Sequence, residues 1–99
     1  MSYVIFEIKN EDSSKINTVV KDDLVSRQSI IIRDANSLEV KGDSTYLKVE
    51  GNDAALKRAQ KLAKELGFTK LNKNKTKEIN EKITAQDDSA ANGIGMIFD

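Results

Sequence analysis

Alternating apolar and polar side chains mark several short strands in the first half of the chain. Residues 3–9 place Val4, Phe6 and Ile8 on one face, which is the period of two expected of a strand. Residues 29–33 contain three consecutive isoleucines and predict a strand at least partly covered on both faces. Alternation returns over 38–41 and 45–50, on either side of Gly42-Asp43. This arrangement predicts a hairpin in which Gly42 supplies a positive φ.

Helical spacing replaces alternation in three places. Apolar residues from Ile16 to Leu24 predict a helix over about 13–25. The clearest helix starts at Ala54, after an Asn52-Asp53 cap, and Gly67 stands where a helix C′ residue is expected. A weaker helix begins at Thr76, and only Ile79 and Ile83 form its apolar face. The apolar stripe of the clearest helix consists of Ala55, Leu56, Ala59, Leu62, Ala63 and Leu66.

This element order predicts an α+β fold. The order β-α-β-β-β-α, plus a C-terminal helix and tail, favours a two-layer sandwich with a mainly antiparallel sheet and helices on one face. We expect residues 1–69 to form a compact α+β domain. Residues 70–99 are expected to form a basic linker, a short helix and a partly disordered tail with an apolar end. Gly93 and Gly95 argue against regular structure in that tail.

The composition argues against an enzyme. The chain has no cysteine and no histidine, so thiolate nucleophiles, zinc–thiolate sites and Ser-His-Asp or Cys-His arrangements are impossible. There is no phosphate-binding loop motif, and the adjacent carboxylates Asp22-Asp23 and Asp87-Asp88 lack the spaced ligands of a metal loop. We therefore expect no catalytic residue, no cofactor and no metal. The N-terminus lacks the features of a signal peptide, and no apolar run is long enough to cross a membrane. These features predict a cytoplasmic protein without a membrane partner.

Charge is distributed unevenly although the net charge is zero. Residues 57–77 carry eight Lys or Arg residues against Glu65 alone, a net charge of +7, whereas 1–56 carry −3 and 78–99 carry −4. Such a basic block indicates an anionic partner or pairing with the acidic blocks.

The start of the clearest helix resembles part of a known family. A sheet followed by Ala54-Ala55-Leu56-Lys57-Arg58-Ala59-Gln60-Lys61-Leu62-Ala63 is similar to the end of a double-stranded-RNA-binding domain. The resemblance implies binding to RNA phosphates through the helix lysines. The family usually has consecutive lysines at the helix start, where this chain has Asn52-Asp53, a cap that is acidic through Asp53. Tyr46 is the single aromatic residue expected to point outward from a central strand. The stacking surface of an RRM-like domain uses more than one such residue.

Two functional hypotheses follow, beside the simpler interpretation that the lysines form a solvated helix face. The first is a non-catalytic module that binds RNA or another polyanion through a basic helix face. The residues assigned to this role are Lys57, Arg58, Lys61, Lys64 and Lys70. The alternative is a protein–protein adaptor or a homodimer that uses the apolar tail, unless that tail packs back on its own domain. Its partner-binding residues are Ile94, Met96, Ile97 and Phe98.

Overall fold

The fold is built on one antiparallel sheet. The computed structural model describes the backbone of residues 2–98 and the side chains of residues 2–86. Within these residues the sheet has four strands in the order β2-β3-β1-β4, and every neighbouring pair is antiparallel. The strands are β1 (Ser2–Ile8), β2 (Ser29–Asp34), β3 (Thr45–Gly51) and β4 (Thr69–Lys70).

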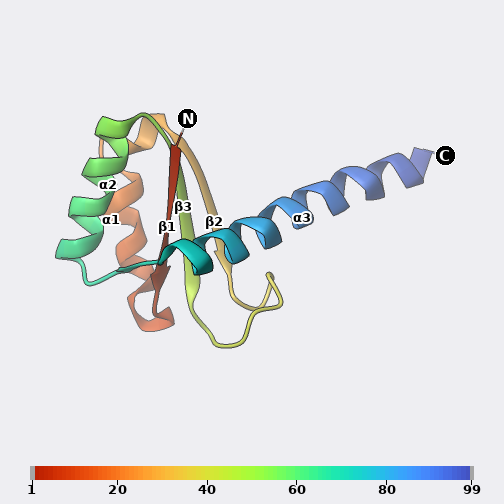
Figure 1. The fold of residues 1–99 in the computed structure, drawn as a ribbon, viewed down its shortest axis with the longest axis horizontal. Helices are drawn as coiled ribbons and strands as arrows, with labels where there is room; N and C mark the ends of the chain where they lie inside the picture. Colours follow the sequence, from red (N-terminus) through yellow and green to blue (C-terminus); the bar gives the residue numbers. More distant parts are fainter. Residues whose placement is uncertain (1, 99) are drawn as a thin grey trace.

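Helices cover both faces of the sheet. α1 and α2 lie on one side of the strands, and α3 lies on the other side and extends away from the sheet (Figure 1). The α+β sandwich with an antiparallel sheet is confirmed. Helices were expected on one face, and α3 also covers the other face, because that face carries the apolar side chains Ile5 and Tyr46. Through β4 the connectivity is that of the split βαβ, or ferredoxin-like, motif. The helices are η1 (Asn10–Lys15), α1 (Ile16–Val20), η2 (Val25–Arg27), α2 (Asp53–Glu65) and α3 (Lys73–Phe98), of which η1 and η2 are 3₁₀-helices.

Two apolar clusters form the core, one on each face of the sheet. In the first cluster, apolar side chains of α1 and α2 pack against Val4, Phe6 and Ile8 of β1. The stripe predicted on α2 is buried except for Leu66, which is partly buried and packs against this cluster. Gly67 has a φ of 81°, and the Phe68 N–H donates to the Ala63 carbonyl, as in a Schellman C-terminal motif.

The second cluster holds α3 against the opposite face. Ile79 and Ile83 of α3 are buried beside Ile5 of β1 and Tyr46 of β3. Burial raises the pKa of the Tyr46 hydroxyl above its usual value, and the charges of Glu7 and Glu78 add to this effect. The short apolar face predicted from the sequence is thus sufficient to pack the start of α3 against the sheet, since both isoleucines are almost fully buried.

The segment 38–41 is not the strand that its alternation predicted. It belongs to the loop between β2 and β3, where the Ala35 N–H donates to the Ser44 carbonyl and extends the ladder of these two strands. Leu38 is buried and Val40 packs against the second cluster, while Glu39 between them has a φ of 58°. β3 has no free edge for a further strand, because β2 and β1 already pair with it on either side.

The helix expected over 13–25 is broken into shorter pieces. α1 ends at Val20, and a 3₁₀-turn begins at Val25. The Asp22 carboxylate accepts hydrogen bonds from the N–H groups of Leu24 and Val25, and so starts a new turn. β-branched residues in α1 also lower its helical propensity. β4 was not predicted, because two residues are too few to show an alternating pattern.

Removing part of the Ile79 side chain tests whether α3 belongs to the core. We expect Ile79→Ala to lower the free energy of unfolding by about 2–5 kcal/mol, because it leaves a cavity between α3 and the sheet. Glu81→Ala, at an exposed position of the same helix, should change it by no more than about 0.5 kcal/mol. Urea unfolding followed by circular dichroism measures both. Equal effects of the two substitutions would show that α3 does not pack as described.

Candidate functional site

The lysines of α2 lie on the side of the helix that faces away from the sheet. Burial of the apolar stripe leaves Lys57, Lys61 and Lys64 exposed at spacings of four and three residues. The helix begins at the expected cap, where the Asn52 Oδ1 atom accepts a hydrogen bond from the Ala55 N–H at 2.8 Å. These three lysines therefore form one positively charged stripe along α2.

Arg58 is engaged within the protein. Its Nε atom lies 2.9 Å from the Oδ1 atom of Asp22, which ties α2 to the turn after α1. This contact with Arg58 holds the pKa of the Asp22 carboxyl below its usual value, although desolvation acts in the opposite direction. Arg58 was assigned with the binding lysines from the sequence, and the structure gives it an internal acidic partner instead of an open position.

Lys70 lies at the edge of the sheet between two hollows. It is the last residue of β4, and its Nζ atom is 3.4 Å from the Oε1 atom of Gln60 on α2. One hollow, of about 390 Å³, lies between α2 and β4 and includes Lys64. The second, of about 830 Å³, lies between the start of β1 and the start of α3. Because Lys70 lines both, it connects the α2 lysines to those of α3.

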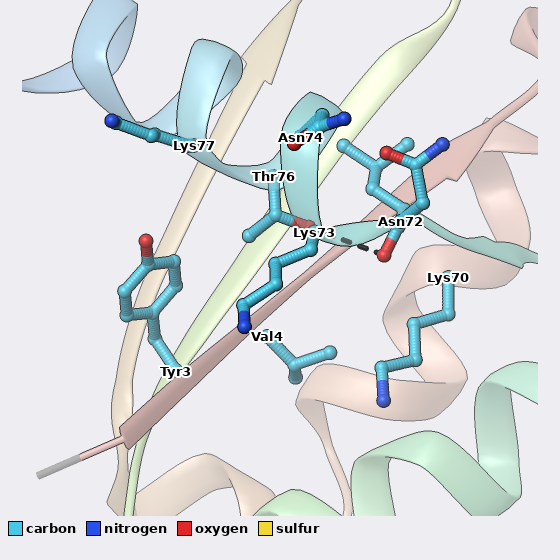
Figure 2. A pocket seen from close by; sticks show the side chains of 9 residues that line it. Tyr3, Val4, Lys70, Asn72, Lys73, Asn74, Thr76 and Lys77 are labelled. Carbon is cyan, nitrogen blue, oxygen red and sulfur yellow. Dashed lines mark hydrogen bonds between the residues drawn. The ribbon is translucent and has the colours of Figure 1, made fainter.

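The larger hollow brings together residues from β1, β4 and the first turns of α3 (Figure 2). Lys73 and Lys77 come from α3, and Tyr3 forms part of the opposite wall. The Lys48 ammonium lies 4.8 Å from the centre of the Tyr3 ring, and the same ammonium donates to the Asn80 Oδ1 atom at 2.7 Å. The tyrosine ring is thus supported from the sheet. The full lining is Tyr3, Val4, Lys70, Leu71, Asn72, Lys73, Asn74, Thr76 and Lys77.

Lys73 and Lys77 were not in the residue set assigned from the sequence. They belong to the basic block of 57–77, so the charge signal included them. Their proximity to Lys70 depends on where α3 begins, and Asn72 sets that point by accepting a hydrogen bond from the Lys75 N–H at 2.8 Å. A capping asparagine just before two lysines spaced i, i+4 was the available signal.

The lining of the two hollows has a single sign of charge. Neither hollow is lined by an aspartate or a glutamate. Within the part of the chain whose side chains are described, Lys64, Lys70, Lys73 and Lys77 form no ion pair. The nearby Lys75 does pair with Glu78, at 3.8 Å. The edge around β4 therefore presents uncompensated positive charge beside concave surface.

Other candidate features lie elsewhere. Tyr46, expected to point outward from a central strand, is covered by α3 with an exposed fraction of 2% and is not available for stacking. The tail side chains of Ile94, Met96, Ile97 and Phe98 lie outside the described residues. Among the residues that are described, no group of acidic side chains could hold a metal ion, and no helix is long and apolar enough to cross a membrane.

Comparison with known proteins found no relative: no family model, curated protein or solved structure matches the chain.

Removing the Arg58 charge should raise the pKa of Asp22. We expect Arg58→Gln to move this pKa upward toward the ordinary value, because the ion pair is the largest cause of its depression. A depressed pKa stabilises the folded state above the unfolded-state pKa of about 3.9 and loses that effect as the pH falls through the folded value. The stability difference between wild type and Arg58→Gln should therefore shrink as the pH falls from 7 toward 3.

The measurement is a carbon NMR titration of the Asp22 carboxyl, with urea unfolding at each pH. Lys57→Gln is the matched control, since it removes an equal charge from the residue directly before Arg58. Lys57 forms no ion pair among the described residues. It should leave the Asp22 pKa close to the wild-type value. An unchanged Asp22 pKa in Arg58→Gln would show that the pair does not form in solution.

Proposed function

We propose that this protein is a non-catalytic module that binds RNA or another polyanion through the basic edge of its sheet. We define the basic edge as Lys64, Lys70, Lys73 and Lys77, with Lys57 and Lys61 continuing it along α2. The observation that supports the proposal is the position of Lys70 between two adjacent hollows that contain no acidic side chain. An extended chain of phosphates could contact lysines from α2, β4 and α3 along this edge.

The start of α3 strengthens the positive potential there. The N-terminus of a helix carries a partial positive charge, so a lysine in the first turns is unfavourable for helix stability. Lys73, Lys75 and Lys77 nevertheless occupy these positions, and only Lys75 has an acidic partner among the described residues. This arrangement has an electrostatic cost in the free protein that a bound anion would offset. A merely solvated helix face would favour acidic residues at these positions.

The chemistry of the edge favours contacts with phosphates over reading of bases. Its charged groups are lysine ammonium groups, which act as point charges without the bidentate geometry of arginine. Phosphate contacts position a nucleic acid but carry no sequence information. Binding is centred toward Lys70, because Asp53 adds a negative charge at the opposite end of α2. The proposed activity is therefore sequence-tolerant and sensitive to salt.

Reversing the charge at Lys70 tests the proposal. We expect Lys70→Glu to weaken binding of a short labelled RNA by at least about tenfold at low salt, since it places a carboxylate between the two hollows. If the wild-type protein neutralises about four phosphates, the logarithm of its binding constant should fall with the logarithm of salt concentration with a slope of about −3. Fluorescence anisotropy with single-stranded RNA, duplex RNA and heparin measures both quantities.

Lys41→Glu is the control for this measurement. Lys41 is exposed in the loop between β2 and β3, so its substitution makes the same change in net charge away from the basic edge. It should reduce affinity far less than Lys70→Glu does. Equal losses for the two variants, or binding that does not depend on salt, would contradict a site at this edge.

A further inference from the structure

The two edges of the sheet differ in how they are protected. An exposed edge strand can pair with another chain, and natural edges are commonly blocked by charged side chains, especially lysine, by proline or by a very short strand. The β4 edge has only two residues, and one of them is Lys70. The β2 edge has six residues, contains Ile30, Ile31 and Ile32, and has neither lysine nor proline. Ile32 is 42% exposed.

The two charged residues of β2 are engaged within their own chain. The Arg33 Nη1 atom donates to the Ile32 carbonyl at 2.9 Å, and its Nε atom donates to the Oε1 atom of Gln86 on α3 at 3.1 Å. The Asp34 Oδ1 atom accepts from the Ser37 N–H at 2.7 Å. Both charges are thus directed toward neighbouring residues, and the isoleucine run between Ser29 and Arg33 carries none.

The backbone of β2 presents hydrogen-bonding groups to the open side. In an antiparallel ladder, alternate residues direct their N–H and C=O groups to one neighbouring strand, and the residues between them direct theirs to the other side. The Ala35 N–H donates to Ser44, so the odd-numbered positions face β3. The backbone N–H and C=O groups of Ile30 and Ile32 therefore point away from β3, toward the open side. Within the described structure β2 pairs with β3 alone.

We propose that a second copy of the chain pairs with this edge, so that two β2 strands join antiparallel across a two-fold axis at Ile31. In this register Ile31 lies opposite Ile31 of the second copy, and Ile30 lies opposite Ile32. The outward N–H and C=O groups of Ile30 then bond to those of Ile32 of the second copy. A carbonyl accepts two hydrogen bonds, so the contact of Arg33 with the Ile32 carbonyl can remain.

The edge is complementary to itself, which favours a second copy over an unrelated strand. A two-fold axis perpendicular to the sheet keeps each residue on its own face, so a residue must pair with one of the same parity. Centring on Ile31 satisfies this rule and sets isoleucine against isoleucine at every position of the run. It also sets Ser29 opposite Arg33, so that no like charges meet. Centring on Ile32 would instead place Ile30 opposite Asp34.

Sedimentation equilibrium of the full chain tests the dimer. Two paired short strands form a small interface, so we expect a dissociation constant on the order of micromolar. The measured mass should therefore reach that of a dimer at protein concentrations well below about 1 mM. Ile32→Lys should raise the dissociation constant at least about tenfold, because it places a charge opposite Ile30 of the second copy. Leu24→Lys makes a similar change at a residue of like exposure, 39%, outside every strand, and should have little effect.

Three outcomes would overturn the proposal. The wild-type chain could remain a monomer at every concentration, or it could grow into assemblies without limit. Alternatively, the dimer could survive Ile32→Lys and be lost in Ile97→Lys, which would assign self-association to the tail. Circular dichroism of each variant verifies that it is folded.

Hydrogen exchange on the unaltered chain gives a second readout that does not depend on any variant folding. The Ile30 and Ile32 amides should exchange more slowly as the protein concentration rises, whereas the Ile31 amide, which faces β3, should be slow at all concentrations. Unchanged exchange at Ile30 and Ile32 over the range in which the mass doubles would rule out this edge. The test is independent of the proposed function, because Ile32 lies on the strand farthest from the basic edge.

Discussion

β1 carries buried apolar side chains on both of its faces, and much of the remaining structure follows from the need to cover them. Val4, Phe6 and Ile8 point to the cluster under α2, while Ile5 points to the cluster under α3. A four-stranded sheet with one helical layer would leave the second face in water, and each large apolar side chain left there would cost roughly 1.5–3 kcal/mol. Docking of Ile79 and Ile83 on that face brings the start of α3 close to the β4 edge. The basic edge is therefore a consequence of how the second face is covered.

Local patterns in the sequence predicted the elements that depend on local interactions. The α2 stripe, its Asn52 cap and Gly67 at the C-terminal end all appear in the structure, because each acts within a few residues. The strand expected over 38–41 failed for a non-local reason: β3, its expected hairpin partner, is already paired with β2 on one side and with β1 on the other. β4 was missed for the opposite reason, since its two residues form a strand only because β1 lies beside them.

The candidate site was predictable in its charge but not in its geometry. The basic block of 57–77 was evident by counting, yet counting could not separate Arg58, which is paired with Asp22, from lysines without an acidic partner. Nor could it show that Lys70 lies between two hollows, because that depends on the turn after Gly67 and on the start of α3. Contacts between residues far apart in sequence decide which charges are compensated, and the sequence pattern alone does not contain them.

The two proposals have a joint geometric consequence. β2 and β4 lie at opposite edges of the sheet, so a dimer joined through β2 would carry a basic edge at each end of one continuous sheet. A polyanion long enough to reach both ends would bind the second edge at a high effective concentration, whereas a short one would bind each edge separately. Affinity would then rise with the length of the polyanion beyond what the number of phosphate contacts at one edge explains. This length dependence would disappear on dissociation of the dimer, because it requires two chains joined through the isoleucines of β2. The salt dependence at each basic edge would remain, because it arises from the lysines of a single chain.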